Sequence, residues 1–367
     1  MKKTHRMKVG FVGCGGFAQG NHIPNVADNP NFEIVGFCDL NDQILGKLKT
    51  KYNPRYVTTD MTKLVADPDV ELVICSTKPD ARLPIMELAA KHEKHLFVEK
   101  PMCYHESEID PMMALTRAGM GQFMVGYNRP YSPLMQDLKP MFNRLRKGNT
   151  TIIYRIIGEA AMWPKHHYDA VMLQKESTIL HEATHIFDLL NWLTDLAPTR
   201  VYTAGGGNVD NIITLNYPEN ITAVVISGDN GSTGYPKERI EINSNGGTII
   251  GDNFVELWSI GVDGTSQRKE YPYTIQGEKM LTSACEFNTK LWAWRKSVTD
   301  AEQAEGYYYD RFPSTDKGHY HELEFFRQAI SEGQPSQTDA TRGAMASLIA
   351  WRAIDSWKEG RPIDLNF

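Results

Sequence analysis

The stretch from Lys8 to Ala18 holds the residue types of a phosphate-binding turn. An apolar run containing Val9, Phe11 and Val12 leads into Gly13-x-Gly15-x-x-Ala18, and a helical pattern follows. The first glycine permits a tight turn, the second lets the backbone approach a pyrophosphate, and the third small residue lets helix pack on strand. Phosphate then sits on free N–H groups at the helix N-terminus. This turn, including Gly16 and Phe17, is predicted to bind a dinucleotide.

A carboxylate ends the second apolar run, which extends from Phe32 to Cys38. Asp39 at that place can hydrogen-bond the adenosine ribose hydroxyls, and its charge would repel a 2′-phosphate. Leu40 and Asn41 supply no cation to neutralise such a phosphate. NAD rather than NADP is therefore predicted. The alternative is that Asp39 only caps the helix that starts near Asn41.

A lysine follows the predicted strand His95–Val98, in the motif Glu99-Lys100-Pro101. Ligands of open parallel sheets bind outside the carboxyl ends of the strands. There a lysine ammonium can meet the nicotinamide and substrate and stabilise a developing alkoxide. The alternative is a surface lysine before a turn proline, since lysines usually lie outside.

Two histidines and an aspartate lie in a segment whose apolar residues recur at helical spacing: Ile179, Ala183, Ile186, Leu190 and Leu193. His181, His185 and Asp188 fall on another face of that helix, where His185 could remove a proton from a hydroxyl. The segment also spells the zinc-peptidase pattern His-Glu-x-x-His, but no downstream third ligand accompanies it, and no metal is predicted. Two partly buried histidines without a role are the remaining alternative.

Composition is that of a soluble enzyme. The 367 residues suggest about two domains, and 41% hydrophobic residues suffice for real cores. A net charge of −6 and a pI near 6.0 argue against a nucleic-acid partner. No segment approaches the ~18 consecutive apolar residues of a membrane span. The basic N-terminus leads into a strand rather than a signal peptide, and the five cysteines show no CxxC spacing, so we expect a cytoplasmic protein.

Strands and helices alternate up to about residue 128, which predicts an α/β fold with a doubly wound parallel sheet over residues 1–128. After the glycine turn, helices are expected at 41–52, 82–92 and 106–118, and strands at 72–76, 95–98 and 122–127. Residues 129–367 read as an α+β domain on a large open, mainly antiparallel sheet. Its expected strands are 150–158, 200–204, 211–217, 222–227, 239–243, 247–251 and 255–260, and helices at 320–330 and 344–357 close the chain.

One face of the second sheet is expected to lack helices. Residues such as Val224, Ile226 and Ile242 would then form a larger apolar patch than a monomer usually exposes. A homodimer or homotetramer, or a larger homo-oligomer, is therefore expected to form through that face.

Taken together, the motifs resemble the glucose–fructose oxidoreductase/inositol 2-dehydrogenase (Gfo/Idh/MocA) family over nearly the whole chain. Besides the motifs above, the resemblance rests on Gly126-Tyr127-Asn128-Arg129, Arg239-Ile240-Glu241-Ile242, His321-Glu322-Leu323, Gly333 and Gly360-Arg361-Pro362. It implies oxidation of a secondary hydroxyl of a pyranose, glycoside or inositol by NAD or NADP. It also implies that Lys100 and His185 are the catalytic pair. His181, one helical turn before His185, is a third catalytic candidate that could relay the proton or orient the substrate. Thr77, Glu99 and Asn128 are expected to help hold the cofactor.

The chain departs from the family pattern at three places. His181 and Ala183 replace the aspartate and glycine of Asp-x-Gly-x-His, and Glu176-Ser177-Thr178 replaces a glycine run. Arg82 stands at the histidine position of the loop that starts at Thr77. The proton relay and the substrate shape can therefore differ from those of the inositol enzymes.

Candidate substrate-binding residues are Arg129 and the polar and aromatic group Trp163, His166, His167 and Tyr168, which suits a sugar face. The substrate is expected to be a small sugar, glycoside or polyol. Alternatives to a sugar or glycoside dehydrogenase are an inositol dehydrogenase, a non-catalytic NAD-binding regulator on the same fold, and the zinc hydrolase discounted above.

Overall fold

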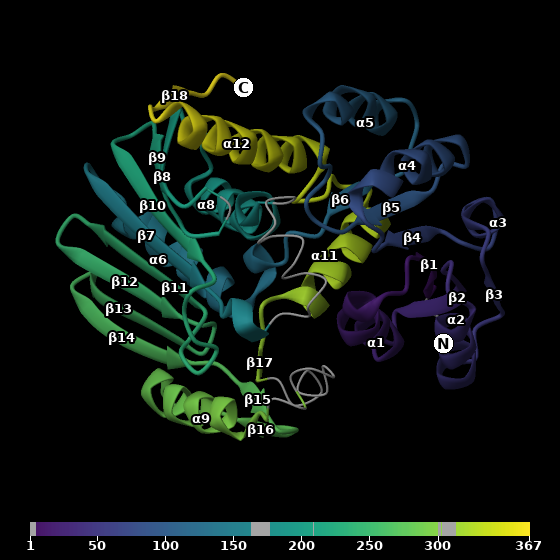
Figure 1. Cartoon of the computed structure of the whole chain (residues 1–367), viewed down its shortest axis with the longest axis horizontal. Coiled ribbons are helices and arrows are strands. Elements are labelled where there is room, and N and C mark those ends of the chain that lie inside the picture. The colour runs from purple at the N-terminus through teal and green to yellow at the C-terminus, as the bar shows by residue number, and fades with distance from the viewer. Residues whose placement is uncertain (1–4, 163–176, 208, 300–301, 303–312) are drawn as a thin grey trace. The chain divides into compact units, whose positions relative to one another are not determined.

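The computed structural model describes residues 5–162, 177–207, 209–299, 302 and 313–367, and the chain divides into two compact units (Figure 1). The first unit comprises Met1–Asn128 and His319–Ser347, and the second comprises Arg129–Gly318 and Leu348–Phe367. Residues 319–347, which the sequence analysis assigned to the second domain, thus group with the first unit. Within the described residues, no helix is both long and apolar enough to cross a bilayer.

A six-stranded parallel sheet forms the centre of the first unit, in the order β3-β2-β1-β4-β5-β6. The strands are β1 (Met7–Val12), β2 (Phe32–Cys38), β3 (Tyr56–Thr58), β4 (Leu72–Cys75), β5 (His95–Val98) and β6 (Phe123–Val125). The order reverses direction between β1 and β4, which is the switch point at which ligands of doubly wound sheets bind. The predicted Rossmann architecture is confirmed.

The helices of the first unit connect these strands. They are α1 (Ile23–Ala27), α2 (Asp42–Tyr52), α3 (Met61–Val65), α4 (Arg82–Lys91) and α5 (Ile109–Arg117). Helix α11 (His319–Glu332) comes from far along the chain and packs on α1. There the Glu324 carboxylate accepts a hydrogen bond from the Asn29 amide at 2.9 Å. The first residues of α12 (Ala340–Glu359) complete the unit.

The second unit is built on a nine-stranded, mainly antiparallel sheet, as expected. Its order is β14-β13-β12-β11-β7-β10-β9-β8-β18, and only the pair β7 and β10 runs parallel. The strands are β7 (Thr150–Ile157), β8 (Arg200–Gly205), β9 (Asn211–Tyr217), β10 (Ile221–Gly228), β11 (Glu238–Ser244), β12 (Gly247–Asp252), β13 (Glu256–Val262), β14 (Thr265–Glu270) and β18 (Ile363–Asp364).

Burial alternates along these strands, so one face of the sheet is covered and the other is open. Helix α6 (Pro133–Leu145) packs on part of the covered face, where Leu134 and Leu138 of the helix lie against β12. Val224 and Ile226 lie on the open face as predicted, but Ile242 does not. Ile242 is fully buried and pairs with Ile152 and Ile249 on the covered face. Its neighbours Glu241 and Asn243 take the open face instead, since side chains alternate with period two.

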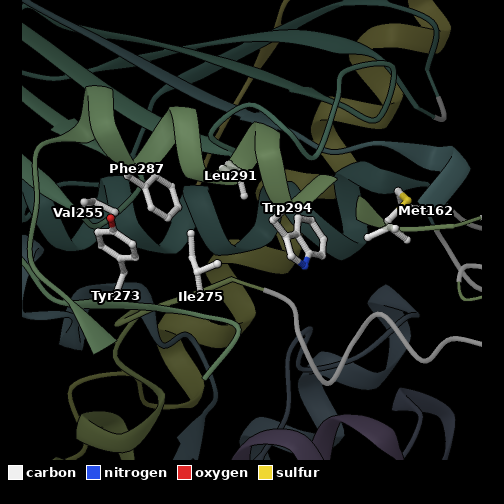
Figure 2. Close-up of a cluster of buried hydrophobic side chains, with 8 residues drawn as sticks. Met162, Val255, Tyr273, Ile275, Phe287, Leu291 and Trp294 are labelled. Atoms are coloured by element: carbon white, nitrogen blue, oxygen red, sulfur yellow. The ribbon is translucent and has the colours of Figure 1, made fainter. Parts of the chain in front are cut away.

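A smaller apolar cluster stabilises the end of the second unit around helix α9 (Ala284–Ser297). Figure 2 shows Phe287, Leu291 and Trp294 of α9 facing the small sheet β16-β15-β17. The strands of this sheet are β15 (Tyr273–Ile275), β16 (Glu278–Met280) and β17 (Ser314–Thr315). The rings of Phe287 and Tyr273 meet edge to face with centroids 4.7 Å apart. Helix α8 (Thr184–Thr194) of the same unit carries His185.

Candidate functional site

The candidate cofactor residues of the first unit gather where its parallel strands end. The glycine turn follows β1, Asp39 follows β2, Thr77 follows β4, and Glu99 and Lys100 follow β5. Asn128, buried, lies just beyond the end of β6. Backbone hydrogen bonds hold the residues that follow these strands side by side: Gly13 N–H donates to Cys38 O, and Glu99 N–H donates to Cys75 O.

The glycine turn has the shape that a pyrophosphate requires. Gly13 has φ +82°, and a Cβ there would lie within 3 Å of Ser76 and Thr77. This position therefore needs glycine. A Cβ on Gly15 or Gly16 would meet no protein atom within 4 Å, so both glycines border open space that a ligand can enter. The neighbouring Phe17 is 45% exposed, whereas Ala18 is buried.

Asp39 connects the glycine turn to the second strand. Its carboxylate accepts hydrogen bonds from Cys14 N–H at 2.7 Å and from Asn41 N–H at 2.9 Å. The cap of helix α2 is Asn41, whose side chain accepts from Gln43 N–H and Ile44 N–H. Asp39 is therefore not the helix cap, and the alternative reading of this carboxylate fails. Each carboxylate oxygen has a further lone pair that a ribose hydroxyl could use.

Lys100 follows a buried carboxylate, Glu99, whose hydrogen-bond partner the sequence did not reveal. The Glu99 carboxylate lies 2.5 Å from Nε2 of the buried His22 and also accepts the Lys100 N–H at 3.1 Å. Burial works to raise the pKa of Glu99, but the His22 hydrogen bond and the nearby charges lower it below its usual range. Glu99 is thus an anion that holds the backbone of Lys100. The Lys100 side chain itself is partly exposed.

Arg82, at the position where the family has histidine, is a buried structural cation. Its guanidinium donates to Thr77 O at 3.0 Å and to Pro101 O, and it lies 3.5 Å from Lys100 O. Burial lowers the pKa of this group, while Glu99 is among the anions that oppose the shift. One side chain therefore joins the loops after β4 and β5. The altered position could be recognised from the motif, but the partners of Arg82 could not.

In the second unit, the predicted helix with the two histidines begins irregularly. Residues Ile179–Ala183 form a π-helical turn, and α8 follows it. Ser177 and Thr178 fix the start of this turn, because their hydroxyls donate to Gly207 O and Val209 O. His181 is partly exposed, whereas His185 and Asp188 are only 6% and 1% exposed. The extra residue of a π turn changes the phase of the helix, so regular spacing alone could not place these side chains.

Glu182, between the histidines, pairs with Lys237 at 3.1 Å. Lys237 immediately precedes β11 and also faces Asp229. Burial raises the pKa of Asp229 to about 8; Lys237 opposes this shift, and Glu182 and Asp210 add to it. Asp229 is therefore protonated at neutral pH, and Glu182 is the carboxylate that pairs directly with Lys237.

Arg129, predicted to contact substrate, is buried in an ion network. Its Nε and Nη2 donate to the two oxygens of Glu238 at 3.1 and 3.0 Å. Tyr154 and Lys317 donate to the same carboxylate at 2.8 and 2.6 Å. Burial opposes ionisation of Glu238, but Arg129, Lys317 and Lys237 keep its pKa well below the usual range. This contact network occupies the Arg129 guanidinium, and a role toward substrate stays a prediction.

The other predicted substrate residues, Trp163, His166, His167 and Tyr168, lie outside the described residues. In the part of the chain that is described, no three His, Cys, Asp or Glu side chains are grouped as a metal ion would need.

Comparisons with known proteins agree with this fold. Residues 7–127 match the family model GFO_IDH_MocA, an oxidoreductase family with an NAD-binding Rossmann fold. The chain is 21% identical to the uncharacterized oxidoreductase YrbE of Bacillus subtilis, over 99% of this chain and 98% of the relative. It is also 21% identical to myo-inositol 2-dehydrogenase of Thermotoga maritima, over 98% and 99%. The solved scyllo-inositol dehydrogenase of Lactobacillus casei with NAD(H) and scyllo-inositol superposes with a TM-score of 0.75 over 98% of this chain and 99% of that one, at 16% identity.

Asp39 should make the protein prefer NADH over NADPH. Asp39→Ala, and Asp39→Asn, which keeps an acceptor for Cys14 N–H, should both narrow that preference because they remove the charge that repels a 2′-phosphate. Dissociation constants from cofactor fluorescence test this. The exposed Asp42, three residues on, provides the control variant Asp42→Ala, which should keep the preference. Equal or tighter NADPH binding by the unaltered protein would contradict the assignment.

Asp229→Asn should stabilise the protein more at high pH than at low pH. The carboxyl group ionises near pH 4 when unfolded but near pH 8 when folded, so the ionised unfolded state is increasingly favoured between these values. The amide carries no such penalty. The gain in free energy of unfolding at pH 9 should exceed that at pH 5 by on the order of 1 kcal/mol or more. Denaturant unfolding at both pH values measures it, and an equal effect would show that Asp229 is ionised in the folded protein.

Proposed function

Because the chain belongs to the Gfo/Idh/MocA family of oxidoreductases, we propose that it is an NAD-dependent dehydrogenase of a sugar, glycoside or related polyol. The observation that carries this proposal is the placement of Lys100. It follows β5 at the sheet edge that also holds the glycine turn, Asp39 and Thr77, and its backbone is held by Glu99 and Arg82. That edge is where ligands of doubly wound sheets bind.

In the proposed reaction, a secondary ring hydroxyl becomes a ketone. Bound NAD⁺ supplies the hydride acceptor. His185 removes the hydroxyl proton, for which an imidazole has a suitable pKa range. Lys100 donates a hydrogen bond to the same oxygen and stabilises its developing negative charge. His181, one helical turn before His185, relays the proton or orients the substrate.

An inositol is the second candidate substrate, because myo- and scyllo-inositol dehydrogenases are among the similar proteins. His181 replaces the aspartate of the family motif, which favours a different relay and leaves sugars and glycosides as the first candidates. A screen of NAD⁺ reduction against inositols, free hexoses and aryl glycosides tests the proposal. Tight NADH binding without oxidation of any of them would favour the non-catalytic regulator.

His185→Ala and Lys100→Ala should each lower turnover by about 10²–10⁴-fold, as loss of a positioned base or charge typically does. NADH affinity should change little, because neither side chain is assigned to the pyrophosphate. His181→Ala should cost less if this residue only orients. Steady-state kinetics and NADH titration check all three variants. If His185→Ala keeps near-normal turnover while His181→Ala abolishes it, His181 is the base.

The open face of the nine-stranded sheet should form a homo-oligomer interface. Its exposed apolar residues come from four strands: Ile153, Tyr202, Ile212, Trp258 and Ile260. Apolar side chains exposed on several strands of one sheet face are typical of an interface between proteins. Light scattering at micromolar concentration should give a dimer or tetramer of the 41.5 kDa chain. Ile153→Arg, in the middle of the sheet, should dissociate it, and a monomeric unaltered protein would contradict the proposal.

A further inference from the structure

An ion pair of the described residues connects the turn that carries the two histidines to the sheet. Glu182 lies between His181 and His185 in the sequence, and its Oε2 is 3.1 Å from Lys237 Nζ. Lys237 stands directly before β11, so the pair joins the π-helical turn to the sheet of the same unit. Both side chains are partly exposed, at 28% for Glu182 and 37% for Lys237.

Lys237 faces three acidic side chains of the described residues, and Glu182 is the one of these three that pairs with it directly. Glu238 is already bound by Arg129, Tyr154 and Lys317. Asp229 holds a proton at neutral pH, as argued above. Burial works to lower the pKa of Lys237, yet Glu182 and the other carboxyl groups raise it above its usual value. The contact is therefore between an ammonium and a carboxylate.

Each charge of this pair would act on the histidines if the other were removed. A carboxylate without its cation favours the protonated imidazole, and an ammonium without its anion favours the neutral one. Together the two charges largely cancel. A π turn has i→i+5 hydrogen bonds in place of the i→i+4 bonds of an α-helix. A contact at Glu182, its fourth residue, restricts the conformation of the turn that carries the histidines.

We infer that Lys237 is a positioning residue for the histidine turn: through Glu182 it fixes the turn and neutralises the carboxylate next to His181 and His185. The inference rests on the proposed function only where His185 is called the base. Other titratable groups of the described residues around the turn remain unchanged in the variants below: Asp188 on α8, Tyr217, Asp210, Asp229, Arg129, Tyr154, Glu238 and Lys317.

Histidine ring titration by NMR tests the inference without any substrate. His181→Gln and His185→Gln assign the two signals. Lys237→Met should raise the proton affinity of at least one of these imidazoles, and Glu182→Gln should lower it, each by about two- to tenfold. The double variant should return close to the unaltered protein, and so should Lys237→Arg, because it restores the cation.

A matched control is Lys269→Met, which removes a lysine of the same unit that pairs with Asp137 at 2.5 Å on the edge strand β14. It should leave both imidazoles unchanged. If the imidazole proton affinities shift in the same direction in Lys237→Met and Glu182→Gln, or shift in neither, the inference is overturned. A contact that only supports the structure would not shift these affinities in opposite directions.

Kinetics then separate this inference from the proposed function. Once a substrate that the protein oxidises is identified, kcat/KM can be measured against pH for each variant. The acid limb of this profile should shift in the same direction as the imidazole titration of that variant. If the unaltered protein oxidises no substrate, the proposed function fails, and the NMR signs still decide the role of Lys237.

Discussion

The buried guanidinium of Arg82 holds together the two loops from which the first unit presents its chemistry. Arg82 donates hydrogen bonds to the backbone oxygens of Thr77 and Pro101. Lys100 lies next to Pro101 in the second of these loops, and its N–H donates to the carboxylate of Glu99. A buried cation is costly unless hydrogen bonds and anions compensate it. Here backbone oxygens and Glu99 provide that compensation, and His22 in turn holds Glu99. The position of the Lys100 backbone thus depends on Arg82 and His22, two buried side chains that are not among the predicted catalytic or cofactor residues.

The Rossmann half was predictable because its signals are local. Short apolar runs bounded by turns fixed the strands, and β5 over His95–Val98 and α2 ending at Tyr52 agree with the predicted limits. The glycine motif also predicted its own backbone, since Gly13 adopts a positive φ. His22 and Arg82 were beyond such reasoning. Their partners lie in the loops after β4 and β5, and a single sequence gives no reason to bury these polar side chains until the fold brings the partners to them.

The second unit was predictable in its strands but less so in its faces and helices. The alternation of side chains along a strand correctly predicted Val224 on the open face. Ile242 lies on the covered face instead, because it pairs with Ile152 of β7 and Ile249 of β12. Helices α6 and α9 were missed: α6 contains Pro140, which interrupts the usual pattern, and α9 carries exposed Trp292 beside buried Trp294. The π turn before α8 shifted the helical phase that the apolar spacing predicted.

Two buried carboxyl groups of the second unit differ in protonation: Glu238 is ionised and Asp229 is not. This difference determines the charge near the histidine turn. Glu238 remains ionised because Arg129, Lys317 and Tyr154 all bind it, although burial opposes the charge. Among the described residues no cation forms an ion pair with Asp229, since Lys237 pairs with Glu182, and burial keeps Asp229 protonated. If Asp229 were ionised, it would compete with Glu182 for Lys237. Because Asp229 is protonated, Lys237 pairs with Glu182 alone of these two carboxyl groups. The ion pair that holds the turn with His181 and His185 is therefore present at neutral pH.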